Sequence, residues 1–280
     1  MDLSEKYAQA AEWIREAHAL LVTAGAGMGV DSGLPDFRGD AGFWKAYPLY
    51  QRLGISFVDA ANPDHFERDP SFGWGFYGHR TNLYRETVPH RGFSILLEWS
   101  RRFGMEYFVA TSNVDGQFQK AGYREEAVLE FHGSIHHLQC TRPCSSRIWE
   151  NSEQFGIDFE TMRSDHVPLC PHCGATARPN ILMFGDWGWI EDRTRRQQDR
   201  FRAFLDRNAG KRIVVVEMGA GTAIPTVRAA SERVGSLSRA HVVRINPREP
   251  RIAPPHISLP CNALEALAAI DDCLTKPTRG

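Results

Sequence analysis

The sequence predicts an α/β fold built on a parallel sheet, and three observations support this prediction. Short apolar and β-branched runs alternate with stretches of helical length. At 42% hydrophobic and 24% charged residues, the 280-residue chain can fill a core. Glycine-rich or polar segments at 24–38, 111–115 and 244–248 mark the ends of three apolar runs. Because ligands gather at the carboxyl ends of parallel strands, we expect the functional site at that edge of the sheet.

Periodicity and composition place each element. Tyr7, Ala10 and Ile14 recur at helical spacing, which predicts an amphipathic first helix. The run Ile213–Val216 is typical of a strand buried on both faces. The expected elements are, in order, a helix at 4–18, a strand at 20–23, an aromatic-rich helical region at 44–90, a helix at 93–103, and strands at 107–111, 128–131, 211–218 and 241–245.

A glycine-rich segment follows the first strand. Gly25, Gly27 and Gly29 remove side chains where the backbone turns, which lets amide groups approach a phosphate closely. The dinucleotide fingerprint Gly-x-Gly-x-x-Gly is not met, because Val30 stands at its last position. These residues therefore indicate either a nucleotide site or only a tight strand-to-helix turn.

Four of the six cysteines form two close pairs, Cys140 with Cys144 and Cys170 with Cys173. Two thiolate pairs supply the four soft ligands that tetrahedral zinc prefers, and a full set of four argues for a structural ion. An iron–sulfur cluster, a redox dithiol and ordinary buried cysteines are the alternatives. This use of cysteine is typical of a reducing compartment, so we expect a cytoplasmic protein.

Two polar segments contain candidate catalytic residues. Asn113 and Asp115 follow the strand at 107–111, where they either serve a ligand or form a turn. His132 follows the strand at 128–131, and histidine suits a base that works near neutral pH. His136 and His137 compete with it, either as structural residues or as spare metal ligands.

The glycine-rich segment continues into Ser32–Gly39, and together they resemble the sirtuin signature Gly-Ala-Gly-x-Ser-x-x-Ser-Gly-Ile-Pro-x-Phe-Arg. Gly29 stands where sirtuins usually carry Ser, Ser112 replaces a Gln, and Gly219-Ala220-Gly221 replaces Gly-Thr-Ser. Further segments resemble sirtuin motifs in the family's order: Thr111–Asp115, Phe131–Gly133, Arg178–Asp186, Val243–Asn246 and Pro260–Asn262. The resemblance extends over about residues 20–262.

The resemblance implies a Rossmann-like sheet domain with a smaller zinc-binding and helical domain formed by two insertions. The expected parts are the NAD-binding domain at 1–43, 91–135 and 179–280, the helical insertion at 44–90 and the zinc-binding insertion at 136–178. It also implies NAD-dependent removal of acyl groups from protein lysine, giving nicotinamide and O-acyl-ADP-ribose. NAD is then consumed as a co-substrate, one zinc is structural, and the partner is an acylated protein or peptide.

The resemblance also assigns residues to roles. His132, Asn113 and Asp115 are expected to be catalytic, and Cys140, Cys144, Cys170 and Cys173 to hold zinc. The expected cofactor-binding residues are Gly25, Ala26, Gly27, Asp36, Phe37, Arg38, Ser112, Asn113, Asp115, Gly219, Asn246 and Cys261. The expected substrate-binding residues are Tyr77, Arg80, Phe184 and Gly185.

Tyr77 and Arg80 bear on the choice of acyl group. Sirtuins that remove succinyl, malonyl or glutaryl groups carry a Tyr-x-x-Arg pair at this place. Arg80 can bind a carboxylate through two hydrogen bonds while Tyr77 donates its hydroxyl. The alternative is an amphipathic helix with Arg80 on its solvent face.

Charge and hydropathy exclude several classes of function. A net charge of −1 predicts no general attraction to nucleic acid or to a membrane surface. No apolar run reaches the roughly 18 residues of a membrane span, and no secretory signal is expected. An ADP-ribosyltransferase or NAD hydrolase on the same scaffold is the second hypothesis, favoured by Gly29, Ser112 and residues 219–222. A noncatalytic NAD- or ADP-ribose-binding module is the third, and the oligomeric state stays open.

Overall fold

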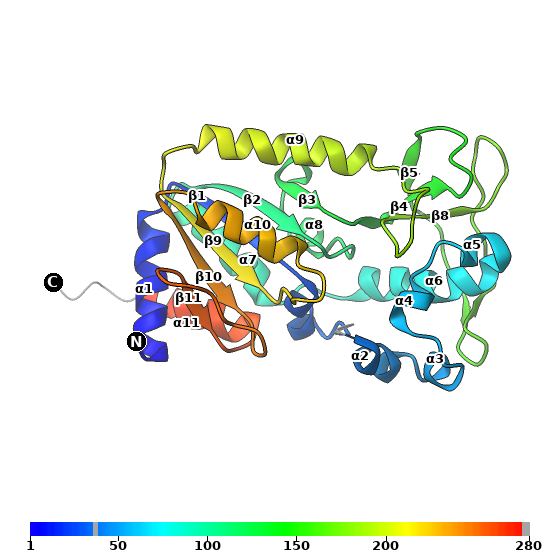
Figure 1. Ribbon diagram of the computed structural model, residues 1–280, viewed down its shortest axis with the longest axis horizontal. Helices are drawn as coiled ribbons and strands as arrows, with labels where there is room; N and C mark the ends of the chain where they lie inside the picture. Colours follow the sequence, from blue (N-terminus) through cyan, green and yellow to red (C-terminus); the bar gives the residue numbers. More distant parts are fainter. Residues whose placement is uncertain (36–38, 276–280) are drawn as a thin grey trace.

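The computed structural model describes residues 1–35 and 39–275, in which the largest sheet has six parallel strands. Their order is β11–β10–β9–β1–β2–β3 (Figure 1). Their bounds are β1 (Ala19–Ala24), β2 (Glu106–Thr111), β3 (Val128–Glu130), β9 (Ile213–Met218), β10 (Ala240–Ile245) and β11 (Ile257–Leu259). This arrangement confirms the predicted parallel α/β fold, although the three-residue edge strand β11 was not predicted.

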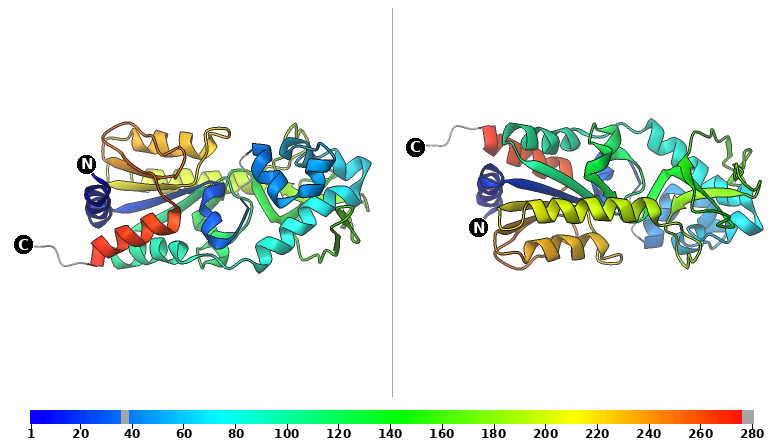
Figure 2. Two further views of the ribbon diagram at one scale, coloured as in Figure 1. Left: turned by 90° about the horizontal axis from the view of Figure 1, so that it is seen from below. Right: turned by 90° about the horizontal axis from the view of Figure 1, so that it is seen from above.

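Helices cover both faces of the sheet (Figure 2). α1 (Leu3–Glu16), α7 (Arg91–Arg102) and α11 (Ala263–Thr275) pack on one face, and α9 (Asp192–Arg207) and α10 (Thr226–Gly235) on the other. Alternation along β1 explains the two layers: Leu20 and Val22 join the core with α1, α7 and α11, whereas Leu21 joins the core that contains Phe204 of α9.

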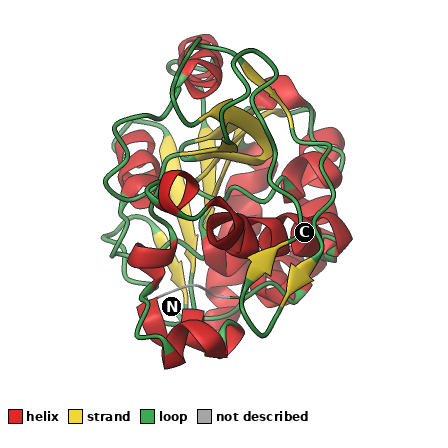
Figure 3. Ribbon diagram, turned by 90° about the vertical axis from the view of Figure 1, so that its right-hand side faces the viewer, coloured by secondary structure: helices red, strands yellow, loops and turns green. Residues whose placement is uncertain are grey.

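A smaller part lies beyond the carboxyl ends of the strands, on the right in Figure 1, and Figure 3 views the molecule from this end. Its helices are α2 (Gly39–Ala46), α3 (Pro48–Arg52), α4 (Phe57–Ala60), α5 (His65–Arg68) and α6 (Pro70–Glu86). They share an aromatic core with the antiparallel sheet β5 (Ile148–Glu150), β4 (Gly133–Cys140) and β8 (Ala177–Ile181). A two-stranded sheet, β6 (Ile157–Asp158) and β7 (Arg163–Ser164), lies against α6. The aromatic-rich region is therefore helical, as expected.

Strand register brings the expected site segments together. Ala24 of β1 pairs with Thr111 of β2 on one side and with Met218 of β9 on the other, and Met218 pairs with Ile245 of β10. Since these strands end at the same level, the segments that follow them share one edge. Three short helices lie in these connections: η1 (Ala26–Met28) and η2 (Val30–Ser32) after β1, and α8 (Gln117–Lys120) after β2. η3 (Glu125–Ala127) leads into β3, which ends one residue before Phe131.

The described part of the chain contains no helix that combines the length and the apolar content of a membrane span. The division of the chain into an NAD-binding domain and two insertions stays a prediction. Figure 1 shows the spatial separation that motivates it, with the six-stranded sheet at one end of the molecule and the aromatic helices at the other.

Candidate active site

A cavity of about 1010 Å³ lies between the carboxyl edge of the large sheet and the smaller part of the molecule. Residues from both parts line it, including the segments that follow β1, β2, β8 and β9, and helix α6. The predicted site residues among its lining are Gly25, Ala26, Tyr77, Arg80, Ser112, Asn113, Asp115, His132, Phe184 and Gly219. The structure therefore brings predicted catalytic, cofactor-binding and substrate-binding residues around one cavity.

Two backbone loops meet at the bottom of this cavity. The Gly25 N–H donates to Met218 O (2.9 Å), and the Gly27 N–H donates to Gly219 O (3.1 Å). Gly219 has a φ of +60°, and a Cβ built on it would lie 2.4 Å from the Gly27 Cα. A Cβ on Gly25 would lie 2.8 Å from the Ala220 Cα. Glycine is therefore required here by close backbone contact, with both loops fixed against each other.

Gly29 has a steric explanation. A Cβ at this position would lie 2.9 Å from Leu34 Cδ1, so a serine would force the Leu34 side chain to move. Leu34 is buried and lines the cavity. The departure from the sirtuin signature at Gly29 thus accompanies a tightly packed leucine at the same turn.

Asn246 forms hydrogen bonds to two loops that line the cavity. Its side chain is fully buried, donates from Nδ2 to Ala220 O (2.8 Å) and accepts from the Arg248 and Glu249 N–H groups (both 3.0 Å). Arg228 also donates to Ala220 O, through Nε at 3.1 Å and Nη2 at 3.0 Å. Asn246 does not itself line the cavity, so in this structure it holds the loop at 219–224 in place.

Asn113 connects β2 to the glycine-rich loop. Its Nδ2 donates to Gly25 O (3.1 Å), and its backbone N–H donates to Thr111 Oγ1 (3.0 Å). Thr111 Oγ1 in turn donates to Ala24 O (2.9 Å). The predicted turn and the predicted site coincide, because the turn places Asn113 on the cavity wall.

Asp115 is a buried carboxyl group on the same wall. Burial raises its pKa to about 6, and the charge of Glu130 acts in the same direction. The Gln117 N–H, which donates to Asp115 Oδ1 (3.0 Å), and the charge of Arg80 oppose this rise. At neutral pH the carboxylate is therefore ionised at an energetic cost that a bound ligand can offset.

His132 lines the cavity at the end of β3, whereas His136 and His137 do not. Burial lowers the pKa of His132, and a hydrogen bond to the Ser112 backbone opposes this. The imidazole is thus neutral at physiological pH and can accept a proton. His136 instead contacts the backbone oxygen of Asp115 through Nε2 (2.9 Å), which supports the wall. The Leu182 N–H donates to His132 O (2.9 Å), so the backbone of His132 is joined to the segment after β8.

Tyr77 and Arg80 lie one turn apart on α6 and both reach the cavity. Arg80 is 7% exposed, and its Nε and Nη2 donate to the Tyr84 hydroxyl at 3.0 and 2.7 Å. Burial raises the pKa of Tyr77 to about 12, so its hydroxyl keeps its proton and remains a donor. Arg80 is therefore a buried cation and not a residue of a solvent-facing helix surface.

Sequence reasoning missed Tyr84, which lines the cavity and holds Arg80. The spacing of Tyr84 could have predicted its position, because it follows Tyr77 by two helical turns and therefore lies on the same face of α6. Arg248 and Glu249, just after Asn246, also line the cavity and were not predicted.

Several predicted residues do not line the cavity. Gly27 and Gly185 lie outside the lining, and Gly185 has a φ of +67°, which ends the extended segment. Cys261 is 6% exposed, with its Sγ 3.6 Å from the Tyr7 hydroxyl of α1. The predicted residues 36–38, which are Asp36, Phe37 and Arg38, lie outside the described part of the chain.

The four predicted metal ligands converge at one point. The Sγ atoms of Cys140, Cys144, Cys170 and Cys173 all lie within 4.8 Å of one another. Cys140 Sγ is 3.6 Å from Cys173 Sγ, and Cys144 Sγ is 3.7 Å from Cys170 Sγ. Zinc–sulfur bonds of about 2.3 Å in a tetrahedron give sulfur separations of about 3.8 Å, so these residues fit a zinc ion. None of the four lines the large cavity, which fits a structural ion.

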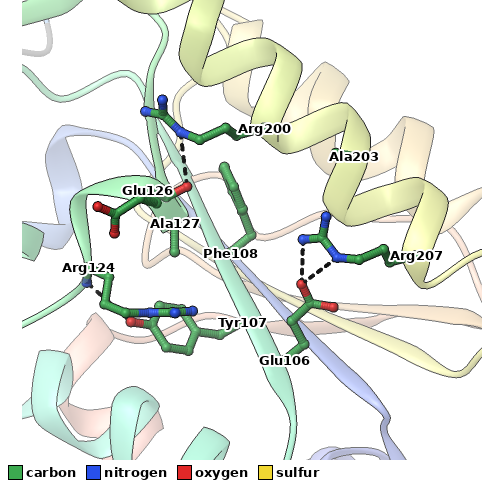
Figure 4. Close-up of a pocket in the computed structure, with 9 residues that line it drawn as sticks. All are labelled: Glu106, Tyr107, Phe108, Arg124, Glu126, Ala127, Arg200, Ala203 and Arg207. Carbon is green, nitrogen blue, oxygen red and sulfur yellow. Dashed lines mark hydrogen bonds and ion pairs between the residues drawn. The ribbon is translucent and has the colours of Figure 1, made fainter.

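A smaller cavity of about 320 Å³ lies at the opposite end of β2 (Figure 4). Its three arginines already have partners: Arg207 with Glu106, Arg200 with Glu126 O, and Arg124 with the Tyr107 ring. None of the predicted site residues that the structure describes lines it. The candidate active site is therefore the larger cavity.

Three features together define the class of protein: the six-stranded parallel sheet, the cavity lined by glycine-containing loops and the cluster of four cysteines. The family model described as "Sir2 family" matches residues 25–199. The chain belongs to the Sir2 family, the sirtuins. The resemblance to the sirtuin family is thereby confirmed.

Curated relatives extend this result over almost the whole chain. An "NAD-dependent protein deacylase" of Thermus thermophilus is 32% identical over 278 residues, which cover 95% of this chain and 94% of that protein. One of Caldanaerobacter subterraneus is 31% identical, covering 85% of this chain and 86% of its own length. One of Thermococcus kodakarensis is 35% identical over 177 residues, which make up 63% of each chain.

Solved structures show the same fold. A Sir2 homologue in complex with NAD has a TM-score of 0.71 at 23% identity and covers 95% of this chain and 93% of that one. A Sir2 homologue in complex with ADP-ribose has a TM-score of 0.68 at 24% identity, with 95% of both chains covered. The architecture of a Rossmann-like sheet and a smaller domain is thus shared with these proteins.

Proposed function

We propose that this protein removes acyl groups from lysine side chains of proteins and consumes NAD in doing so. The observation that carries the proposal is that His132, Asn113 and Asp115 line the same cavity as the glycine loops and the segment after β8. Curated relatives with this activity in their names support it. One water molecule is consumed in the reaction, and the products are then free lysine, nicotinamide and O-acyl-ADP-ribose.

The glycine loops would hold the NAD phosphates through backbone contacts, because they have no side chains at their closest approach. Asn113, Ser112 and Asp115 would contact the nicotinamide end, since they share one wall. When bound, NAD supplies the electrophilic ribose carbon that the acyl oxygen attacks as nicotinamide leaves. His132, neutral at physiological pH, would accept the proton of the ribose hydroxyl group that attacks next.

The acylated polypeptide would lie along the segment Ile181–Phe184, which lines the cavity after β8. Strand addition at such an edge gives main-chain hydrogen bonds without restricting the bound sequence. Phe184, at the end of this segment, is held in place by two contacts. Its N–H donates to Ala61 O (3.1 Å), and the centroid of its ring lies 5.9 Å from that of Phe57.

The acyl group would reach Tyr77 and Arg80. A buried guanidinium beside a protonated phenol suits an acyl chain that ends in a carboxylate, because the carboxylate is paired where water is scarce. We therefore infer a preference for succinyl- or glutaryl-lysine over acetyl-lysine.

The cysteine cluster would hold one zinc ion, which joins the end of β4 to the 170–173 turn and stabilises the smaller part. A cytoplasmic location is supported by the six free thiols, all within the described residues. The test of the proposed function is whether an acyl-lysine peptide stimulates nicotinamide release from NAD. No stimulation, or release that ignores the peptide, contradicts it.

A further inference from the structure

Trp187 is the most exposed large apolar side chain of the described residues, with 100% of its surface open to solvent. An indole offers a large apolar area, and tryptophan is strongly enriched in the energetic centres of interfaces. Single exposed leucines or valines need no explanation, but a fully exposed tryptophan three residues after a cavity-lining phenylalanine is unusual.

The loop that carries Trp187 is held on both sides. Before it, the Asp186 carboxylate accepts from Arg178 Nη1 and Nη2 at 2.7 and 2.9 Å, and these two side chains are 1% and 2% exposed. Asp186 Oδ1 also accepts from the Gly188 N–H (3.0 Å). After it, Gln139 of β4 donates to Gly188 O (2.8 Å) and accepts from the Ile190 N–H (3.0 Å). Trp187 is therefore presented to solvent by a fixed backbone.

In the chain, Trp187 follows a segment that lines the cavity and precedes a residue close to the cysteine cluster. Leu182 and Phe184, a few residues before it, line the cavity. Directly after it, a Cβ on Gly188 would lie 3.9 Å from Pro143 Cγ, and Pro143 precedes the metal ligand Cys144. A polypeptide that leaves the cavity along this segment would pass Trp187.

The cavity mouth has an apolar rim that comes from three separate segments. Val58, Leu182 and Ile224 line the cavity and are 49%, 40% and 44% exposed. These side chains give the cavity an apolar surface that is open to solvent. An acylated segment with an apolar side chain near the lysine matches this surface better than a fully polar one.

We propose that Trp187 is a substrate-binding residue that packs on an apolar or aromatic side chain flanking the acyl-lysine. The inference rests on the proposed function and adds the class of polypeptide that this site selects. Because the loop is already ordered, binding loses little conformational entropy, and most of the indole contact contributes to affinity. The preference acts on peptide binding and leaves NAD binding unchanged.

The test uses acetyl- and succinyl-lysine peptides in two designs. One design carries glycine at every flanking position, and the other carries phenylalanine at one flanking position at a time. kcat/KM and the calorimetric Kd are measured for the wild type, Trp187→Ala, Trp187→Phe and Leu237→Ala. Leu237 is the matched control, 49% exposed and outside the cavity lining.

We expect at least one phenylalanine position to improve wild-type binding by about tenfold over glycine. Trp187→Ala should lose this gain, Trp187→Phe should retain part of it, and Leu237→Ala should keep all of it. All four proteins should turn over the glycine peptide equally.

Equal phenylalanine-to-glycine ratios in the wild type and Trp187→Ala would overturn the inference while the proposed function stands. If no peptide is turned over, the proposed function fails, and the calorimetric ratios alone decide the inference. A wild type that binds none of the peptides overturns both.

Discussion

Gly219 and Gly27 meet backbone to backbone, with the Gly27 N–H donating to Gly219 O at 3.1 Å. The left-handed φ of Gly219 and the 2.4 Å separation between its would-be Cβ and the Gly27 Cα leave no space for a side chain. The loop after β9 and the loop after β1 therefore form one continuous backbone surface, which we propose as the site of the NAD phosphate groups.

Gly219→Ala should separate these loops. The new methyl group clashes with main chain that cannot rotate away, so we expect a loss of NAD binding together with a lower Tm. Gly210→Ala is the matched control, because Gly210 has a φ of +75° but open space around it. The control should show only the backbone strain, about 1–2 kcal/mol. Calorimetric titration with NAD and thermal melting of both variants check this. Equal NAD affinity in the two variants would contradict the tight loop contact.

His132→Ala should abolish deacylation while most of the NAD affinity remains. In the proposed mechanism the imidazole acts as a base after both substrates are bound, so its loss should affect kcat more than binding. Turnover at saturating NAD and peptide and a direct NAD titration measure the two effects. A variant with wild-type kcat excludes His132 as the base. His137→Ala serves as the control, since His137 lies outside the cavity lining.

Asp115→Asn should make stability depend less on pH. In the folded protein the pKa of Asp115 is about 6 against an ordinary value of 3.8, so the folded state binds its proton more tightly. The free energy of unfolding of the wild type therefore falls as the pH rises from about 4 to 6 and stays reduced above that range. Asparagine has no such proton, and its Oδ1 can still accept from the Gln117 N–H.

The asparagine variant should be more stable than the wild type at pH 8, by on the order of 2–3 kcal/mol, and equally stable near pH 4. Denaturant unfolding at the two pH values measures the difference. The same variant should turn over NAD more slowly, because it lacks the carboxylate that we propose contacts the nicotinamide end of NAD. A stability difference that does not change with pH would show that Asp115 is not the buried titrating group.

Removal of the metal should destabilise the smaller part of the molecule. Cys170→Ala leaves three thiolates, so we expect less than one zinc per chain by elemental analysis and a Tm lower by about 5 °C or more. Cys273→Ala is the control, because Cys273 is on α11 and outside the cluster. If the wild type contains no zinc by elemental analysis and melts at the same temperature with and without added zinc, a structural ion is ruled out.

Arg80→Met should change acyl selectivity. We expect kcat/KM for succinyl-lysine to fall at least tenfold more than kcat/KM for acetyl-lysine, because only the succinyl carboxylate loses its ionic partner. Tyr84→Phe should lower the succinyl preference less, since it removes the hydroxyl that accepts from Arg80 Nε and Nη2 but leaves the cation. An unchanged acetyl-to-succinyl ratio in Arg80→Met would leave Arg80 as a structural residue.

The sheet and most of the cavity could be predicted because their signals are local. Ile213–Val216 is a run that only a buried strand explains, and the metal ligands are close pairs in the sequence. β11 (Ile257–Leu259) was missed because it lies between Pro255 and Pro260, and prolines so close to a short run argue against a strand. The burial of Cys261 depends on Tyr7, which lies 254 positions away, and the pairing of Arg80 with Tyr84 depends on the packing of α6 against the cavity. Contacts of this kind come from tertiary structure alone.

Product analysis tests the central claim most directly. The wild-type protein is incubated with NAD and succinyl- or acetyl-lysine peptides, and the products are identified by mass spectrometry. From the wild type, deacylation predicts free lysine peptide, nicotinamide and O-acyl-ADP-ribose in equal amounts. From His132→Ala it predicts neither free lysine peptide nor O-acyl-ADP-ribose, and at most one nicotinamide per enzyme, because nicotinamide leaves before the base acts. Free or protein-linked ADP-ribose, with the acyl group still on the peptide, would contradict deacylation and indicate an NAD hydrolase or ADP-ribosyltransferase, and intact NAD would indicate a binding module.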